Sequence, residues 1–232
     1  MTFQIGAVLS DGIVLASDLK IIEIDKAGQN ATTSGHSPKI IFSENPPVMY
    51  CWAGDETPGR IARAFVNNQL RSPSMRMHDL LYQAGMYVWT EDYGPKYKVC
   101  PTKVELKHWD GDLLLAARTE SGIELWRVHY GADCEPRQIS DKSSCGNNCA
   151  IFLLEKYYTR SLTIKEALPL IAHCIIMGGE INSTGVDGLE IATWIKDEDK
   201  PTRLSPTKID SLIQTSRELD EGIGKLVLGS SE

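Results

Sequence analysis

The chain has 232 residues, of which 42% are hydrophobic, and its formal net charge is −7 at pH 7. This length and apolar content suffice for a sizeable core, and we predict a single domain over residues 1–232. The acidic balance argues against nucleic-acid and membrane-surface partners. No apolar stretch has spanning length, no signal-peptide pattern opens the chain, and the six cysteines are scattered, so we expect a cytoplasmic protein with free thiols.

The expected elements begin at once with strands. Residues 3–9 and 12–18 predict a hairpin, closed by a three-residue loop at 10–12 with Gly12 in the left-handed position. Residues 37–43 and 47–53 predict a second pair of strands, separated by "ENP". The later patterns predict helices at 55–70 and 75–94, strands at 102–109, 112–120 and 122–130, helices at 147–158 and 164–177, a strand at 188–195 and a helix at 205–223. Paired helices between runs of strands favour antiparallel sheets covered by helices.

The first hairpin places a hydroxyl beside a carboxylate. A loop at residues 10–12 pairs Gln4 with Asp18, and the alternation of side chains then puts Thr2 and Asp18 on one face as diagonal neighbours. If Met1 is removed, Thr2 carries both a hydroxyl and an α-amine, whose pKa is about 8. One residue would then supply a nucleophile and its base, and a lysine held nearby by an aspartate would tune both groups. An ordinary structural interpretation stays open, since a threonine at position 2 and a strand ending in aspartate are both common.

Several segments resemble one known family. "TFQIGAVLSDGIVLASD" resembles the start of a mature proteasome β-type subunit, and its spacing from Thr2 to Asp18 matches without a gap. "SPKIIF" resembles the segment that supplies the family's catalytic lysine and points to Lys39, although about six extra residues precede it. "VMYCWAGDETPGRIARAF" matches the strand whose final glycine, here Gly54, provides the oxyanion-hole N–H. "CGNNCAIFLLEKYYTRSLTIKEALPLIAHCI" and "STGVDGLEIATWIKDE" resemble later segments, so the similarity covers nearly the whole chain.

The resemblance implies an α+β N-terminal nucleophile hydrolase fold, a four-layer αββα sandwich with two stacked antiparallel sheets. It implies a threonine-type endopeptidase that needs no cofactor and cleaves protein or peptide substrates inside homo-oligomeric rings. An ATP-dependent unfoldase is a conceivable further partner. Helix faces rich in apolar side chains, such as that around residues 80–86, are the expected subunit interfaces.

Three positions depart from the family pattern. Cys145 stands where a serine orients the threonine amine, Asn182 replaces an aspartate, and Gly185 replaces the serine that follows it. A thiol is a poor hydrogen-bond partner and an amide carries no charge, so the outer support of Thr2 is altered. The alternative function is therefore a non-catalytic proteasome-like assembly protein, with Met1 retained or the Thr2 site disabled.

The resemblance also predicts a substrate pocket. Trp52 would lie at its base, Ile22 and Ser37 on its walls, and Glu56 near its rim, although Trp52 could equally be a core residue. A pocket of this kind would favour small or medium uncharged residues on the N-terminal side of the cut bond. The five histidines never cluster at metal-ligand spacing, so we expect no metal centre.

Overall fold

The computed structural model describes residues 2–24, 31–54, 56–70, 76–99, 111–131, 134–145, 151–181 and 187–228. Within these ranges, two five-stranded antiparallel sheets lie face to face. The first sheet has the order β10 (Lys142–Cys145), β1 (Gln4–Leu9), β2 (Gly12–Ser17), β11 (Glu190–Ile195) and β12 (Thr202–Arg203). The second has the order β5 (Ile40–Glu44), β6 (Pro47–Gly54), β7 (Gly111–Thr119), β8 (Gly122–Tyr130) and β9 (Glu135–Ile139).

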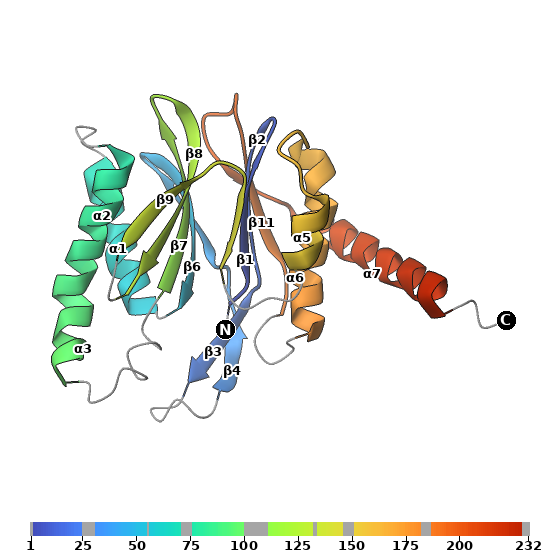
Figure 1. The fold of residues 1–232 in the computed structure, drawn as a ribbon, viewed down its shortest axis with the longest axis horizontal. Helices are drawn as coiled ribbons and strands as arrows, with labels where there is room; N and C mark the ends of the chain where they lie inside the picture. The colour runs from blue at the N-terminus through green and yellow to red at the C-terminus, as the bar shows by residue number, and fades with distance from the viewer. Residues whose placement is uncertain are drawn as a thin grey trace.

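Helices cover the outer face of each sheet (Figure 1). On the second sheet lie α1 (Glu56–Leu70) and α2 (Met77–Val88), and α2 runs through a π-helical turn at Trp89–Tyr93 into α3 (Gly94–Val99). On the first sheet lie α5 (Ile151–Tyr157) and α6 (Ile164–Ile181), while α7 (Pro206–Leu228) packs outside α6 and extends away from the body. The predicted α+β, four-layer αββα sandwich is therefore confirmed.

The alternation of side chains along β6 shows how the layers pack against one another. Val48, Tyr50 and Trp52 point toward α1 and α2, whereas Met49 and Cys51 point between the sheets. These five side chains are at most 5% exposed, so β6 is apolar on both faces. A strand buried on both sides lies at the centre of a sandwich, which places its final residue, Gly54, at the edge of the interior.

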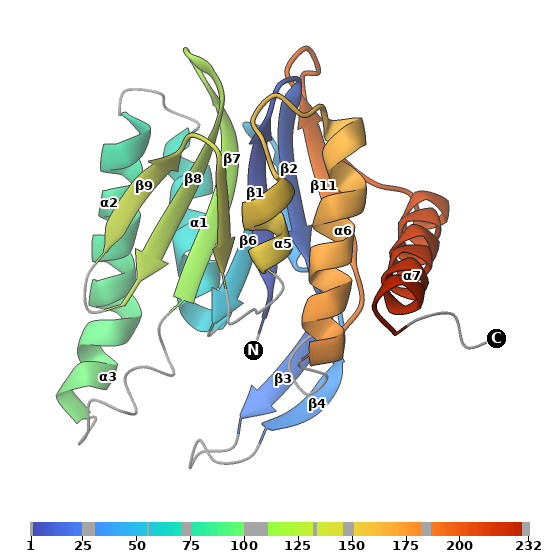
Figure 2. The same cartoon turned by 45° about the vertical axis from the view of Figure 1, so that its right-hand side comes forward.

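The first strand holds the start of the chain at one end of the sandwich. Phe3 is fully buried under α6, where the Gly178 backbone leaves room for its ring. The N-terminus therefore lies at the end of β1, close to the hairpin of β3 (Lys20–Ile24) and β4 (Ala31–His36) (Figures 1 and 2). Because Phe3 is buried at this position, the adjacent Thr2 is held at the same end of the sandwich.

The predicted register of the first hairpin is wrong by one residue, and the expectation that strand alternation puts Thr2 and Asp18 on one face is wrong with it: Asp18 lies opposite Phe3, and Lys39 links it to Thr2. Leu9 pairs with Gly12 and Gln4 with Ser17, so the connection is the two-residue turn Ser10–Asp11. Gly12 does not have a positive φ angle. Its role is close packing, because a Cβ atom there would lie 2.2 Å from the backbone oxygen of Trp194 in β11.

Several other predictions from the sequence differ from the observed elements. The strands β3, β4, β9, β10 and β12 were not predicted, and the predicted strand at 102–109 lies outside the described residues. The expected interface at residues 80–86 needs a correction: Leu80 and Leu81 belong to the core, and the large hydrophobic side chains that α2 exposes are Tyr82, Met86 and Tyr87. None of the helices in the described part of the chain is long and apolar enough to cross a membrane.

Two helical glycines give a matched test of how α6 positions the first strand. A Cβ atom at Gly178 would lie 2.5 Å from the Phe3 ring, whereas Gly222 in α7 has open space around it. We expect Gly178→Ala to lower the free energy of unfolding by about 1 kcal/mol, because overpacking outweighs the gain in helix propensity. Gly222→Ala should raise it by about 0.5–1 kcal/mol. Urea denaturation measures both, and equal stabilisation by the two variants would contradict this packing.

Candidate active site

The three central residues of the predicted site meet in the structure. The Lys39 Nζ atom lies 2.7 Å from Oδ2 of Asp18 and 3.2 Å from Oγ1 of Thr2. The Asp18 side chain is fully buried and that of Lys39 is 12% exposed. One ammonium group thus bridges a buried carboxylate and the hydroxyl of residue 2.

Asp18 is fixed by the backbone around it. Its Oδ1 accepts the Phe3 N–H at 2.8 Å, and its Oδ2 accepts the Lys20 N–H at 3.0 Å. The Asp18 N–H in turn donates to the Phe3 carbonyl at 3.1 Å, which extends the β1–β2 ladder to residue 18. The carboxylate therefore cannot turn away from Lys39 without losing two backbone hydrogen bonds.

The β3–β4 hairpin brings Lys39 back to Asp18. Lys20 pairs with His36 at the base of the hairpin, and the Ser37 N–H donates to the Leu19 carbonyl at 2.9 Å. The base of the hairpin thus fixes where the chain leaves the site, at residue 19, and where it returns to the site, at residue 37. The extra residues noted in the sequence lie within this excursion, which explains why they do not displace Lys39.

Burial and pairing act in opposite directions on the two charged groups. Burial raises the pKa of Asp18 and lowers the pKa of Lys39 from their usual ranges. The ion pair opposes both shifts and does not cancel them. A lysine with a lowered pKa is closer to releasing its proton near neutral pH, and its amine would then be able to accept the proton of the Thr2 hydroxyl.

Gly54 and Gln4 define the neighbouring side of the site. Gly54 ends β6 with φ of 119°, a conformation that favours glycine, and pairs in register with Gly111. The buried Gln4 side chain in β1 donates from Nε2 to the Trp52 carbonyl at 2.6 Å and so ties the first sheet to the second. Gln4 was not predicted as a site residue, although a polar side chain in an apolar strand two positions after Thr2 was an available signal.

A second unpredicted residue supports Lys39. The buried Glu190 carboxylate, at the start of β11, accepts the backbone N–H groups of Lys39 and Ile40. Sequence reasoning treated this segment only as a late strand. A glutamate inside "GLEIATWI" was a signal that could have been found, because an ionised residue at a core position needs partners.

The altered outer positions are partly visible. Cys145 ends β10, is 1% exposed, and stands opposite Gln4 in the ladder. Burial raises the pKa of its thiol well above the usual range, so it is an inert core group and not a second nucleophile. Asn182 and Gly185 lie outside the described residues. Among the described residues the four cysteines, Cys51, Cys134, Cys145 and Cys174, are free thiols.

The predicted pocket residues are spread over β3, the segment after β4, β6 and α1. Ile22 in β3 and Ser37 after β4 are half-buried. The Trp52 indole stacks on Tyr130 with ring centroids 5.8 Å apart, packs against Gly59 and Gly111, and is 5% exposed. Glu56 begins α1 with its carboxylate exposed and paired with Arg63. Trp52 is thus a core residue in this structure, and its role in a pocket, like those of the other three, stays a prediction.

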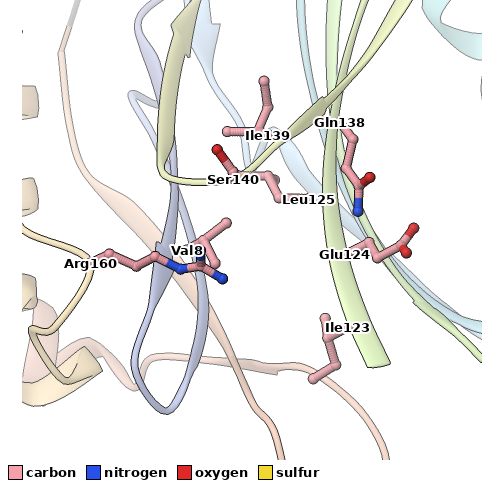
Figure 3. A pocket seen from close by; sticks show the side chains of 8 residues that line it. All are labelled: Val8, Ile123, Glu124, Leu125, Gln138, Ile139, Ser140 and Arg160. Atoms are coloured by element: carbon pink, nitrogen blue, oxygen red, sulfur yellow. The ribbon is translucent and has the colours of Figure 1, made fainter. Parts of the chain in front are cut away.

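A cavity of about 250 Å³ lies at the far end of β1 from Thr2. Figure 3 shows the side chains around it, which come from β1, β8, β9, the β9–β10 turn and the segment between α5 and α6: Val8, Ile123, Glu124, Leu125, Gln138, Ile139, Ser140 and Arg160. Its described walls include none of the predicted site residues. In the described ranges, no three metal-ligating side chains come together.

The two members of the ion pair should differ in their effect on stability. Asp18→Ala should lower the free energy of unfolding by about 3–5 kcal/mol, because it strands Lys39 and two backbone N–H groups. Lys39→Ala should cost less, since Asp18 keeps its two backbone donors and water can reach the vacated position. Asp187→Ala, which removes an exposed carboxylate paired with His36, is the control and should change stability by less than about 0.5 kcal/mol. Equal losses for Asp18→Ala and Lys39→Ala in denaturant titrations would contradict this account.

Comparisons with known proteins agree with this architecture. No protein-family model matches the sequence. The chain is 22% identical to the proteasome subunit beta of Methanosarcina barkeri over 91% of its own length and 93% of that protein, and 22% identical to that of Methanosarcina thermophila. Its fold matches Anbu, described as an ancestral beta-subunit, from Yersinia bercovieri with a TM-score of 0.74 and 12% identity, covering 99% of this chain and 98% of the other. Anbu from Pseudomonas aeruginosa, solved as a helical assembly, matches with a TM-score of 0.72 and 12% identity over 99% of this chain and 97% of that one. The chain therefore has the proteasome-like fold of the Anbu structures and is similar in sequence to proteasome β subunits over nine-tenths of its length.

Proposed function

We propose that this protein is a threonine-type endopeptidase of the N-terminal nucleophile class, built as one domain over residues 1–232. The observation that carries the proposal is the position of Lys39 Nζ, within hydrogen-bond distance of both Thr2 Oγ1 and Asp18 Oδ2. A buried lysine held by an aspartate against a hydroxyl at the start of the chain is costly to maintain. It has an evident chemical use if the hydroxyl is a nucleophile.

The geometry supports a two-step hydrolysis. Removal of Met1 frees the Thr2 α-amine, and the amine or Lys39 takes the proton from Oγ1 as that oxygen attacks a peptide carbonyl. The Gly54 N–H is the proposed donor to the resulting oxyanion. The proton passes to the leaving amine, and water then attacks the acyl-threonine ester, releasing the second product and restoring the hydroxyl.

One observation favours the alternative function, a non-catalytic assembly protein. Cys145 occupies the position of a serine that would orient the Thr2 amine, and its buried thiol is a weak partner. Lys39 nevertheless lies within hydrogen-bond distance of both Thr2 and Asp18, which is why we place the peptidase first. Asn182 remains the other proposed outer residue, and Ile22, Ser37, Trp52 and Glu56 remain the proposed substrate contacts.

We also propose that the protein assembles into a homo-oligomer in the cytoplasm and that the assembly encloses its sites. Two findings support assembly: the Pseudomonas Anbu structure is a helical assembly, and α2 of this chain exposes Tyr82, Met86 and Tyr87 by 44–49%. Clustered exposed apolar side chains usually mark interfaces. Proteins or peptides are the proposed substrates, and an ATP-dependent unfoldase that feeds the enclosed sites is a further partner that such an assembly could use.

The peptidase proposal is tested first at Thr2. Thr2→Ala should lower kcat for a fluorogenic peptide by at least about 10³-fold, because the nucleophile is lost, with little change in thermal stability. Thr2→Ser, which keeps a hydroxyl, is the matched control and should retain measurable turnover. Intact-mass spectrometry of the active wild type should show that Met1 is absent. Full activity of Thr2→Ala, or of protein that retains Met1, would exclude this mechanism.

The assembly is tested by light scattering. The wild type at micromolar concentration should have a mass many times the 25.7 kDa of one chain. Met86→Glu, which places a charge on the exposed face of α2, should reduce that mass, because burying an unpaired charge is costly. Thr207→Glu at the exposed start of α7 is the control. A monomeric wild type would refute the proposed assembly.

A further inference from the structure

Glu190 lies where the two sheets meet beside the proposed site. Its side chain is 4% exposed, and its Oε2 accepts two successive backbone N–H groups, from Lys39 at 2.7 Å and from Ile40 at 3.0 Å. Two donors from neighbouring residues converge on one carboxylate oxygen. This arrangement fixes the backbone of Lys39 in position and direction.

Arg203 completes the contact from the other side. Its Nε lies 2.8 Å from Oε1 of Glu190, and its Nη2 donates to the Ile40 carbonyl at 2.6 Å. Its guanidinium also lies over the Phe42 ring, 5.1 Å from the centroid. Glu190 and Arg203 together therefore hold both the N–H and the C=O of Ile40, the residue that begins β5 directly after Lys39.

The contact of Glu190 with the backbone at Lys39 joins the two sheets. Thr2 and Asp18 flank strands of the first sheet, while Lys39 leads directly into β5 of the second sheet. Glu190 is the first residue of β11 and pairs with Ser17, the neighbour of Asp18. The carboxylate thus ties the start of the second sheet to the strand that carries Asp18.

We infer that Glu190 is a positioning residue for Lys39: it holds the lysine backbone so that Nζ reaches both Asp18 and Thr2. It acts through Lys39 and does not touch the Thr2 hydroxyl in the described contacts. The inference rests on the proposed function for its effect on turnover, and on geometry alone for its effect on Lys39.

Glu190 also adds a negative charge to the surroundings of Lys39. Among the described residues, the groups that face or influence the ammonium are the Asp18 carboxylate from the β2–β3 turn, the Cys51 thiol from β6 and Glu190 from β11, with the Arg203 guanidinium behind Glu190. After the proposed removal of Met1, the α-amine of Thr2 is a further titratable group on the residue whose hydroxyl Lys39 contacts. Asp18 and Glu190 both favour the charged lysine, while burial disfavours it. Removing the Glu190 charge therefore lowers the pKa of Lys39 further, so any limb of the activity profile that reports this group moves to lower pH.

The test compares Glu190→Gln with Glu198→Gln. The first variant keeps the size of the side chain and removes its charge, and the second removes a charge from an exposed glutamate just beyond the same strand. For Glu190→Gln we expect kcat for a fluorogenic peptide to fall by about 100-fold with KM unchanged, because the lysine is misplaced. The pH profile should move to lower pH, and the Lys39 and Ile40 amides should exchange with deuterium faster. Glu198→Gln should match the wild type in all these measurements.

A readout that does not depend on turnover separates the two hypotheses. NMR titration of ¹³C-labelled lysine, with the Lys39 signal assigned from Lys39→Arg, measures the pKa of Lys39 directly. If the wild type hydrolyses no peptide but Glu190→Gln lowers the pKa of Lys39 and deprotects its amide, the positioning role holds and the peptidase proposal fails. If the wild type is active and Glu190→Gln leaves kcat, the pH profile and amide exchange unchanged, the positioning role is overturned and the peptidase proposal stands.

Discussion

The buried ion pair between Lys39 and Asp18 is the constraint on which the rest of the site depends. Taking two charges out of water costs several kcal/mol for each ion unless their partners are nearly complete. Asp18 meets this condition with two backbone N–H groups in addition to Lys39. The pair is therefore held by the fold around it, and the fold must keep residues 3, 20 and 39 together for the pair to exist.

The site also depends on the spacing between the two sheets. Thr2 and Asp18 flank strands of the first sheet, whereas Lys39 directly precedes β5 and Gly54 ends β6 in the second. The Gln4 side chain bonds to the Trp52 carbonyl two residues before Gly54, and Glu190 bonds to the backbone at Lys39. Each contact crosses from one sheet to the other. Packing in the interior between the sheets thus sets the distances among groups that belong to different layers.

Much of this arrangement could be predicted from the sequence. The parts that could not be predicted share one cause, which is that they depend on contacts between distant segments. Apolar periodicity identified most helices and strands, because the pattern along one segment reports which of its faces is buried. The turn register was predicted from local residues alone, whereas in the structure the turn also makes a contact across more than 150 residues: the Asp11 carboxylate accepts the Ile164 N–H at 2.8 Å. The role of Gly12 was missed for the same reason, since its space is limited by β11. Gln4 and Glu190 likewise acquire their partners only when distant strands become neighbours. Thr2, Asp18 and Lys39 were predicted because the family resemblance already contained that long-range information.

The β3–β4 hairpin allows the length of the chain to change without changing the geometry of the site. Its base is fixed at Lys20 and His36, and the residues beyond it do not determine where Lys39 returns. Inserting flexible residues beyond this base would cost only about 0.6 kcal/mol for each doubling of loop length and would leave the ion pair in place. Related chains can therefore differ freely in this segment while keeping the same three residues in contact. The hairpin is the natural place for such proteins to acquire new surface without altering the groups behind it.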